Sequence, residues 1–281
     1  DTICENAPID TSVCLFGKGF AMPVFAGPVG AVNLHYGDCY DDTQYNKILV
    51  NACAENGIAA FTGDGMDANV MVAATKAIKE AGGAGVPTVK PWSREMVADK
   101  MKMVKDSNAF AVAMDIDAAG LPFLKNLNPP AGSKTVEQLG EIVNAAGIPF
   151  IVKGIMTVSG AKKAFDAGAS AIVVSNHGGR VLDQTPATAE VLERIVEWNQ
   201  GRMKIFVDGG IRQGTDIFKA LAMGADAVLI ARPFVQVVYG GAEEGVKLYI
   251  EKLAAELSDT MAMCGAASIK DINRSMLYRP M

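Results

Sequence analysis

The sequence has 281 residues, half of them hydrophobic, so it is long enough to bury a large core. A net charge of −5 and the absence of any block of Lys or Arg argue against a nucleic-acid partner. Every apolar run is far shorter than the about 20 residues that cross a bilayer, so no membrane partner is expected. The five cysteines are scattered and include no CxxC pair, which favours reduced thiols in a cytoplasmic protein and gives no support for a metal site.

Short apolar runs alternate with segments of helical spacing along the chain. The predicted strands cover residues 24–27, 58–62, 86–90, 109–116, 149–153, 171–175, 204–208 and 227–231. The predicted helices cover residues 44–56, 68–81, 93–106, 136–146, 158–167, 187–198, 212–223 and 243–263. Nearly continuous apolar strands that alternate with helices indicate a parallel sheet covered on both faces. Eight such units favour an α/β fold of the (β/α)8 TIM barrel type.

We therefore expect a single domain, with the barrel over residues 23–264. An N-terminal extension over residues 1–22 leads into it, and a C-terminal tail follows over residues 265–281. A doubly wound open sheet is the alternative, but no GxGxxG motif follows the first predicted strand.

Polar residues gather where the predicted strands end, most clearly after the sixth. There, His177 and Arg180 stand three residues apart on the Gly-rich turn of the segment SNHGGR, and His177 is one of only two histidines. A general base and a fixed cation in this place are typical of an active site at the carboxyl end of a barrel. A structural histidine is the alternative. The active site is favoured because Asp117, Lys153 and Asp208 end other strands in the same way.

The ends of the seventh and eighth strands predict a phosphate site. Gly209 and Gly210 let the backbone approach an anion closely, and Arg232 on the neighbouring strand adds a charge that can bind in a bidentate manner. The loops after these two strands are the usual phosphate site of this fold. Asp208 suits a ribityl or ribose hydroxyl better than a phosphate, which it would repel. A tight turn without a ligand is the alternative.

Three segments carry a family resemblance: PFIVKGI, AIVVSNHGGRVLDQTPAT and VDGGIRQGTDIFKALAMGADAVLIARPF. They resemble the FMN-dependent 2-hydroxy-acid oxidase and dehydrogenase family, which includes glycolate oxidase, lactate oxidase, flavocytochrome b2 and mandelate dehydrogenase. The resemblance is dense over residues 148–235 and traceable from Pro23 onward. It implies a (β/α)8 barrel that holds FMN at its carboxyl-terminal rim.

The resemblance also implies catalytic roles. His177 matches the base that takes a proton from the substrate as hydride reaches the flavin, and Arg180 matches the residue that grips the substrate carboxylate. Asp117 matches the carboxylate that pairs with the base. Lys153 matches the lysine that stabilises the anionic reduced flavin.

The resemblance implies a set of cofactor contacts as well. Three parts are distinguished: a strand turn along the flavin ring (Pro28, Val29, Gly30), a grip on the ribityl phosphate (Asp208, Gly210, Arg212, Arg232), and further contacts from the strand ends (Thr62, Thr88, Lys90, Asp115, Lys153, Ser175, Gly209, Ala231).

Two strand ends depart from the family. Its third strand normally ends in Gln-x-Tyr, but Thr88 and Lys90 stand there, so the substrate-binding tyrosine is absent. The family's threonine two residues before the catalytic aspartate is Asp115 here. We interpret these changes as coupled, with a Lys90–Asp115 pair that balances both charges. The family's second substrate tyrosine lies in an upstream segment, which we expect to be missing here.

Two aromatic residues near the rim have alternative interpretations. His35 follows the first strand and either contacts the substrate or lies on a surface loop. Trp92 either covers the flavin or closes the barrel mouth.

We thus predict an FMN-dependent oxidoreductase that converts a small 2-hydroxy acid to the 2-oxo acid, with Arg180 and His177 on the substrate. The alternatives are an FMN-dependent isomerase of the isopentenyl-diphosphate type and a flavin-binding barrel without turnover. The family resemblance further implies a homo-oligomer, commonly a tetramer.

Overall fold

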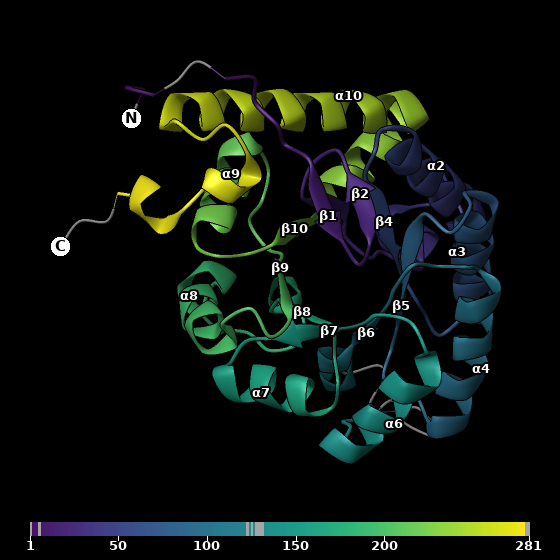
Figure 1. Cartoon of the computed structure of the whole chain (residues 1–281). Coiled ribbons are helices and arrows are strands. Elements are labelled where there is room, and N and C mark those ends of the chain that lie inside the picture. The colour runs from purple at the N-terminus through teal and green to yellow at the C-terminus, as the bar shows by residue number, and fades with distance from the viewer. Residues whose placement is uncertain (1, 5–6, 122–123, 125, 127–131, 279–281) are drawn as a thin grey trace.

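The computed structural model describes residues 2–4, 7–121, 124, 126 and 132–278. Eight parallel strands form a closed barrel in which each strand pairs with the next along the chain, and the last pairs with the first (Figure 1). This closed order confirms the predicted barrel and excludes the open sheet. The strands are β3 (Val24–Ala26), β4 (Ala59–Thr62), β5 (Gly85–Val89), β6 (Val112–Asp115), β7 (Phe150–Ile155), β8 (Ala171–Val174), β9 (Lys204–Val207) and β10 (Ala227–Ile230).

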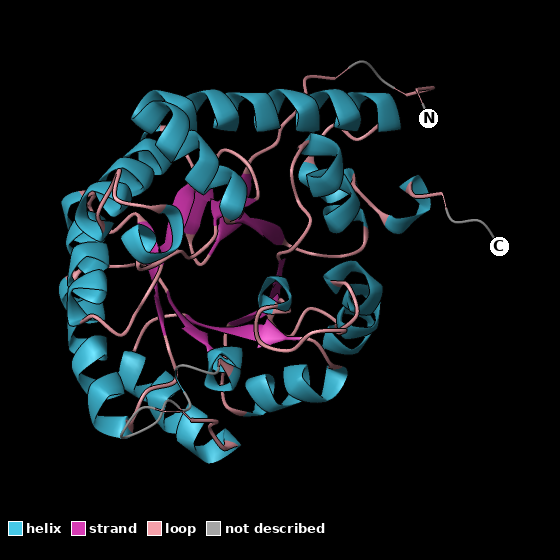
Figure 2. Cartoon of the chain, turned by 180° about the vertical axis from the view of Figure 1, so that it is seen from behind, coloured by secondary structure: helices cyan, strands magenta, loops and turns pink. Residues whose placement is uncertain are grey.

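Helices surround the ring of strands (Figure 2). Their starts are set locally: Asp41 and Thr135 each accept a hydrogen bond from the backbone of a glutamine that bonds back to them, which forms a capping box. The helices are α1 (Val32–Tyr36), α2 (Asp42–Glu55), α3 (Ala68–Glu80), α4 (Arg94–Asp106), α6 (Val136–Ala146), α7 (Val158–Asp166), α8 (Thr188–Asn199), α9 (Gly214–Ala222) and α10 (Arg232–Cys264).

The barrel interior is filled by aromatic side chains. Phe25, Phe61 and Phe206 come from β3, β4 and β9, and their ring centroids lie 5.5 to 6.0 Å apart. A second, larger apolar cluster lies between the strands and the helices. The strands are therefore buried on both faces, which explains why their sequences are apolar almost throughout.

A short antiparallel hairpin, β1 (Val13–Leu15) and β2 (Lys18–Phe20), precedes the barrel and was not predicted. Leu15 and Phe20 join the interior cluster, and the Phe20 ring packs on Phe25 and Phe110. Phe25 lies within β3 and Phe110 just before β6, so the hairpin closes the amino-terminal end of the barrel. Strands of three residues are too short to show an apolar period in sequence.

Several helix starts differ from the prediction, and the last helix differs most. The last helix begins at Arg232 rather than at residue 243, and it is interrupted by non-helical backbone at Gly241 and Ala242. Pro233 in its first turn is typical of a helix start, but the glycines near residue 241 resemble a loop in sequence. Helix α9 begins only at Gly214. No helix formed by the described residues is long and apolar enough to cross a membrane.

Candidate active site

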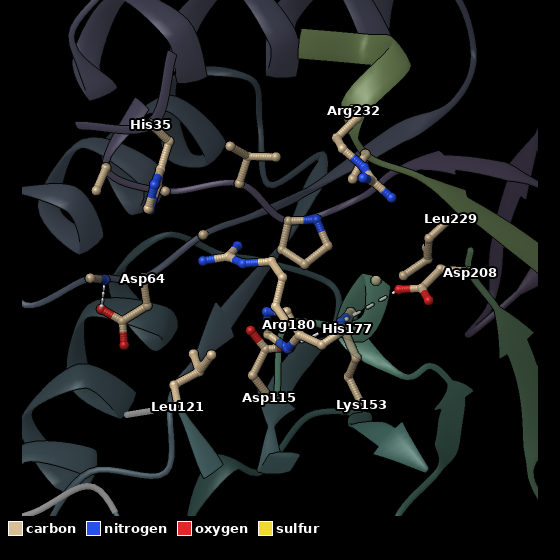
Figure 3. Close-up of a pocket in the computed structure, with 18 of the residues that line it drawn as sticks. His35, Asp64, Asp115, Leu121, Lys153, His177, Arg180, Asp208, Leu229 and Arg232 are labelled. Carbon is tan, nitrogen blue, oxygen red and sulfur yellow. Dashed lines mark hydrogen bonds and ion pairs between the residues drawn. The ribbon is translucent and has the colours of Figure 1, made fainter. Parts of the chain in front are cut away.

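A cavity of about 680 Å³ opens at the carboxyl ends of the barrel strands (Figure 3). Residues within or after each of the eight barrel strands contribute to its wall, β7 through Lys153 alone. Its volume is within the range of small-molecule and cofactor sites, about 300 to 1,000 Å³. The polar strand ends thus meet around one cavity, at the end of the barrel where the site is predicted.

His177 lies on a strained turn after β8. It begins the 3-10 helix η2 (His177–Gly179), with a φ of 56°, and Gly178 follows with a φ of 67°. A left-handed conformation costs a residue with a Cβ about 1 to 2 kcal/mol. The Ser175 hydroxyl accepts the His177 N–H, and the Asn176 side chain accepts the Gly178 N–H. These bonds hold the turn so that the imidazole lines the cavity.

Asp117 orients the His177 ring. It lies on the 3-10 helix η1 (Ile116–Gly120) after β6, and both of its carboxylate oxygens are 3.2 Å from His177 Nδ1. A proton on Nδ1 donates to this carboxylate and leaves Nε2 free to accept one. Gly154 on β7 lies directly against Asp117, since a Cβ on Gly154 would be 2.5 Å from Asp117 Cγ. The pair therefore depends on a glycine that the sequence analysis did not single out.

The Arg180 guanidinium is available to a ligand. It lines the same cavity as His177, and no hydrogen bond or ion pair to this guanidinium is found within the described part of the chain. An unpaired guanidinium at the mouth of a cavity offers a planar fork for a carboxylate.

Lys153 is the centre of a buried polar network below the cavity. Its Nζ is 3.3 Å from Asp115 Oδ1 and 3.5 Å from Asp208 Oδ2, and it donates to Ser175 Oγ at 3.2 Å. The Ser175 hydroxyl in turn donates to Asp208. Burial favours neutral Lys153, but the charges of Asp115 and Asp208 outweigh it and hold the pKa of Lys153 above its usual value.

Asp115 also contacts Lys90, as predicted from the two departures from the family. Lys90 Nζ is 3.7 Å from Asp115 Oδ2, and both side chains are nearly buried. Burial disfavours the ionised form of Asp115. The charges of Lys153 and Lys90 prevail and hold the pKa of this carboxyl well below its usual range.

Sequence analysis missed a buried cluster around Asp64, at the end of β4. The Asp64 carboxylate accepts hydrogen bonds from Lys100 Nζ at 2.7 Å, Trp92 Nε1 at 2.6 Å and the Lys90 backbone N–H at 3.1 Å. Trp92 is fully buried in this cluster and is not part of the cavity wall, so it does not cover the cavity. Lys100 lies within a helix, where a sequence pattern cannot distinguish it from a solvated lysine.

The β9 and β10 ends form the region predicted to bind phosphate. Gly209 and Gly210 have φ values of 90° and 82°, and they line the cavity together with Arg212, Ala231 and Arg232. Because α9 begins at Gly214, its first turn does not start at this glycine pair. Helix α10 begins at Arg232 instead, and since Arg232 lines the cavity, the amino-terminal end of this helix lies at the cavity.

The remaining predicted residues divide into two groups. Pro28, Val29 and Gly30 line the cavity after β3. Thr62 and Thr88 lie at the ends of β4 and β5 but not on the cavity wall, and their buried hydroxyls have no hydrogen-bond partner among the described residues. Ser175 and Asp117 also lie off the wall, and each bonds to a residue that is on it.

His35 lines the cavity from α1. Burial lowers the pKa of His35, and the nearby charges of Arg180 and Lys90 lower it further. The interpretation in which His35 faces a ligand is therefore supported by its position.

Asp115, Asp117 and His177 bring potential metal ligands within 4.8 Å of one another. Their other contacts favour a role in ion pairs rather than in metal binding. Asp115 is held between two lysines, whose charges would repel a cation, and Asp117 faces His177 Nδ1. We assign these residues to the polar network and to the His177 pair.

Comparison with known proteins identifies the family. The family model described as FMN-dependent dehydrogenase matches residues 125–279, which is more than half of the chain. A peroxisomal (S)-2-hydroxyacid oxidase of Arabidopsis thaliana is 49% identical over 142 residues, which cover 50% of this chain and 38% of that protein. Glycolate oxidase of Spinacia oleracea is 48% identical over 128 residues, covering 46% of this chain and 35% of that protein. The chain thus matches well under half the length of these relatives.

Solved structures extend the similarity to the whole barrel. A crystal structure of mandelate oxidase matches with a TM-score of 0.83 and 26% identity, over 98% of this chain and 84% of that one. A mandelate oxidase variant with a monooxide FMN adduct matches with a TM-score of 0.82 and 28% identity, over 98% and 85%. The chain belongs to the FMN-dependent dehydrogenase family.

Proposed function

We propose that this protein binds FMN in the cavity and oxidises a small 2-hydroxy acid to the 2-oxo acid. One observation carries the proposal: the His177–Asp117 pair and the unpaired Arg180 guanidinium face the same cavity. A base and a carboxylate-binding cation are the two groups that a 2-hydroxy acid needs on the protein side.

The cavity residues fit FMN. At the β9–β10 end, a Cβ on Gly210 would meet no atom within 4 Å, so there is space for an anion against the backbone. Arg212 and Arg232 would neutralise the phosphate, and Asp208 would accept from a ribityl hydroxyl.

The protein groups divide the reaction between them. Arg180 would hold the substrate carboxylate, and His177 Nε2 would take the hydroxyl proton. When bound, FMN supplies the acceptor for the hydrogen that leaves C2 with its electron pair. The substrate thereby loses one proton and one hydride and becomes a carbonyl compound.

Asp117 and Lys153 would stabilise the charges that form in this step. The Asp117 carboxylate stabilises the imidazolium that forms on His177. The buried ammonium of Lys153 lines the cavity and would stabilise negative charge that develops beside it.

The names of relatives support this substrate class. Besides the (S)-2-hydroxyacid, glycolate and mandelate oxidases, an L-lactate oxidase of a Roseobacter species is 42% identical over 143 residues, which cover 51% of this chain and 39% of that protein. These names do not favour the isomerase alternative. We also propose a cytoplasmic location and assembly as a homo-oligomer, with a tetramer as the expected form.

An anaerobic titration tests this function. The FMN-loaded protein is mixed with a panel of 2-hydroxy acids while the visible absorbance of the flavin is followed. We expect bleaching by at least one acid and none in His177→Gln, which should keep its FMN and its melting temperature. A flavin that no acid bleaches, or a His177→Gln variant that reacts as fast as the natural chain, would refute the proposal.

A further inference from the structure

Asp115 is shared by two lysines at the cavity wall. Its two carboxylate oxygens face Lys153 at 3.3 Å and Lys90 at 3.7 Å, and the three side chains are only 4 to 11% exposed. All three residues line the cavity. Charges this poorly solvated act on a ligand with little screening.

The surrounding charges are balanced. Lys90 and Lys153 contribute two positive charges, and Asp115 and Asp208 contribute two negative ones, all linked through ion pairs. Removal of one member leaves a buried charge without compensation. Neutralising a lysine therefore leaves this network with a net negative charge, and neutralising an aspartate leaves it with a net positive charge.

Lys90 is held in this network by its backbone. Its N–H donates to Asp64, whose carboxylate is itself fixed by Trp92 and Lys100. The backbone that follows β5 is thus held by a cluster that includes Asp64 after β4 and Lys100 on α4. The Lys90–Asp115 contact is built into the cavity wall rather than formed by a free surface side chain.

We propose that Lys90 and Asp115 act as a charge-balancing pair that sets the reduction potential of a flavin bound in this cavity. The inference rests on the proposed function. Accepting a hydride adds one negative charge to the flavin ring, so a nearby positive charge favours reduction and a negative one opposes it. Without Lys90, Asp115 offsets Lys153; without Asp115, both lysines act on the ring.

Potentiometry against a reference dye tests the pair. We expect Lys90→Met to lower the potential of bound FMN and Asp115→Asn to raise it, each by at least tenfold in the equilibrium constant for reduction, about 30 mV for a two-electron couple. The double variant should return to the potential of the natural chain. Lys90→Arg, which keeps the charge, should also match the natural chain.

Lys204→Met is the matched control. Lys204 forms an ion pair with Asp226 at 2.7 Å, but it lies at the start of β9, away from the cavity. Its loss should leave the potential unchanged. Asp115→Asn risks loss of folding. If Asp115→Asn is insoluble, the potentials of Lys90→Met and Lys90→Arg are enough to test the pair.

The outcomes separate this inference from the proposed function. If the natural chain binds no FMN, the proposed function fails. If it binds FMN and oxidises an acid, but the Lys90→Met potential stays within about 10 mV of the natural value, only the charge-balancing pair is refuted. Shifts of the same sign in both single variants would refute it too.

Discussion

Replacing Gly154 by alanine is expected to disable the His177–Asp117 pair without changing either residue. Gly154 lies on β7 with a φ of 101°, and a Cβ there would be 2.5 Å from Asp117 Cγ and 2.7 Å from its Oδ1. The substitution therefore has two separable effects. One acts on the backbone, and the other acts on the carboxylate that orients the base.

The structure gives the size of each effect. An alanine at positive φ costs about 1 to 2 kcal/mol of stability. To restore an ordinary contact of 3.4 Å, Asp117 must retreat by about 1 Å. A misplacement of about 1 Å at a catalytic group costs about 10²-fold in rate. We thus expect Gly154→Ala to lower kcat about 100-fold while it destabilises the fold only slightly.

Gly147→Ala is the control for the backbone effect. Gly147 also has a positive φ, 68°, but it ends α6 and a Cβ there would meet nothing within 4 Å. Steady-state kinetics and urea unfolding on both variants should show similar losses of stability and a loss of activity in Gly154→Ala alone. Full activity in Gly154→Ala, or equal losses of activity in both, would show that Asp117 does not position the base.

Two further predictions concern the cofactor site and the Asp64 cluster. Arg232→Met should weaken FMN binding about 10- to 100-fold, because a hydrogen bond to a charged group contributes about 1.5 to 3 kcal/mol, and a fluorescence titration that finds unchanged affinity would contradict the phosphate site at β10. Lys100→Met should destabilise the fold by about 3 to 5 kcal/mol in urea unfolding, because it leaves the buried Asp64 carboxylate without its cation. Asp64→Asn combined with Lys100→Met should recover most of that loss, and a double variant as unstable as the single one would contradict the assignment.

The barrel was predictable because its signal is local. The run Ala171–Val174 is apolar on both faces and is followed by polar residues, and most of the other strands show a similar pattern. The His177–Asp117 pair was predicted from the family resemblance, and the structure brings the two side chains together although β7 lies between their strands, β6 and β8.

The features that were missed depend on contacts between distant parts of the chain. Asp64 and Lys100 lie 36 residues apart, and only the packing of α4 brings the ammonium to the carboxylate. The β1–β2 hairpin has strands of three residues, and its burial depends on a barrel that forms around Leu15 and Phe20. Helix α10 was predicted too short because Gly241 breaks the helical pattern inside it.

Closure of the barrel has a consequence for its assembly. The first strand of the ring, β3, pairs with the last, β10, across about 200 residues of sequence, so the ring can close only after β10 has been synthesised. Gly209, Gly210 and Arg232 belong to the last two strand ends. During synthesis on the ribosome, the turn that carries His177 is thus made before the residues predicted to bind the phosphate. A cofactor that binds there would therefore require a closed ring, and its binding would stabilise the pairing of β3 with β10.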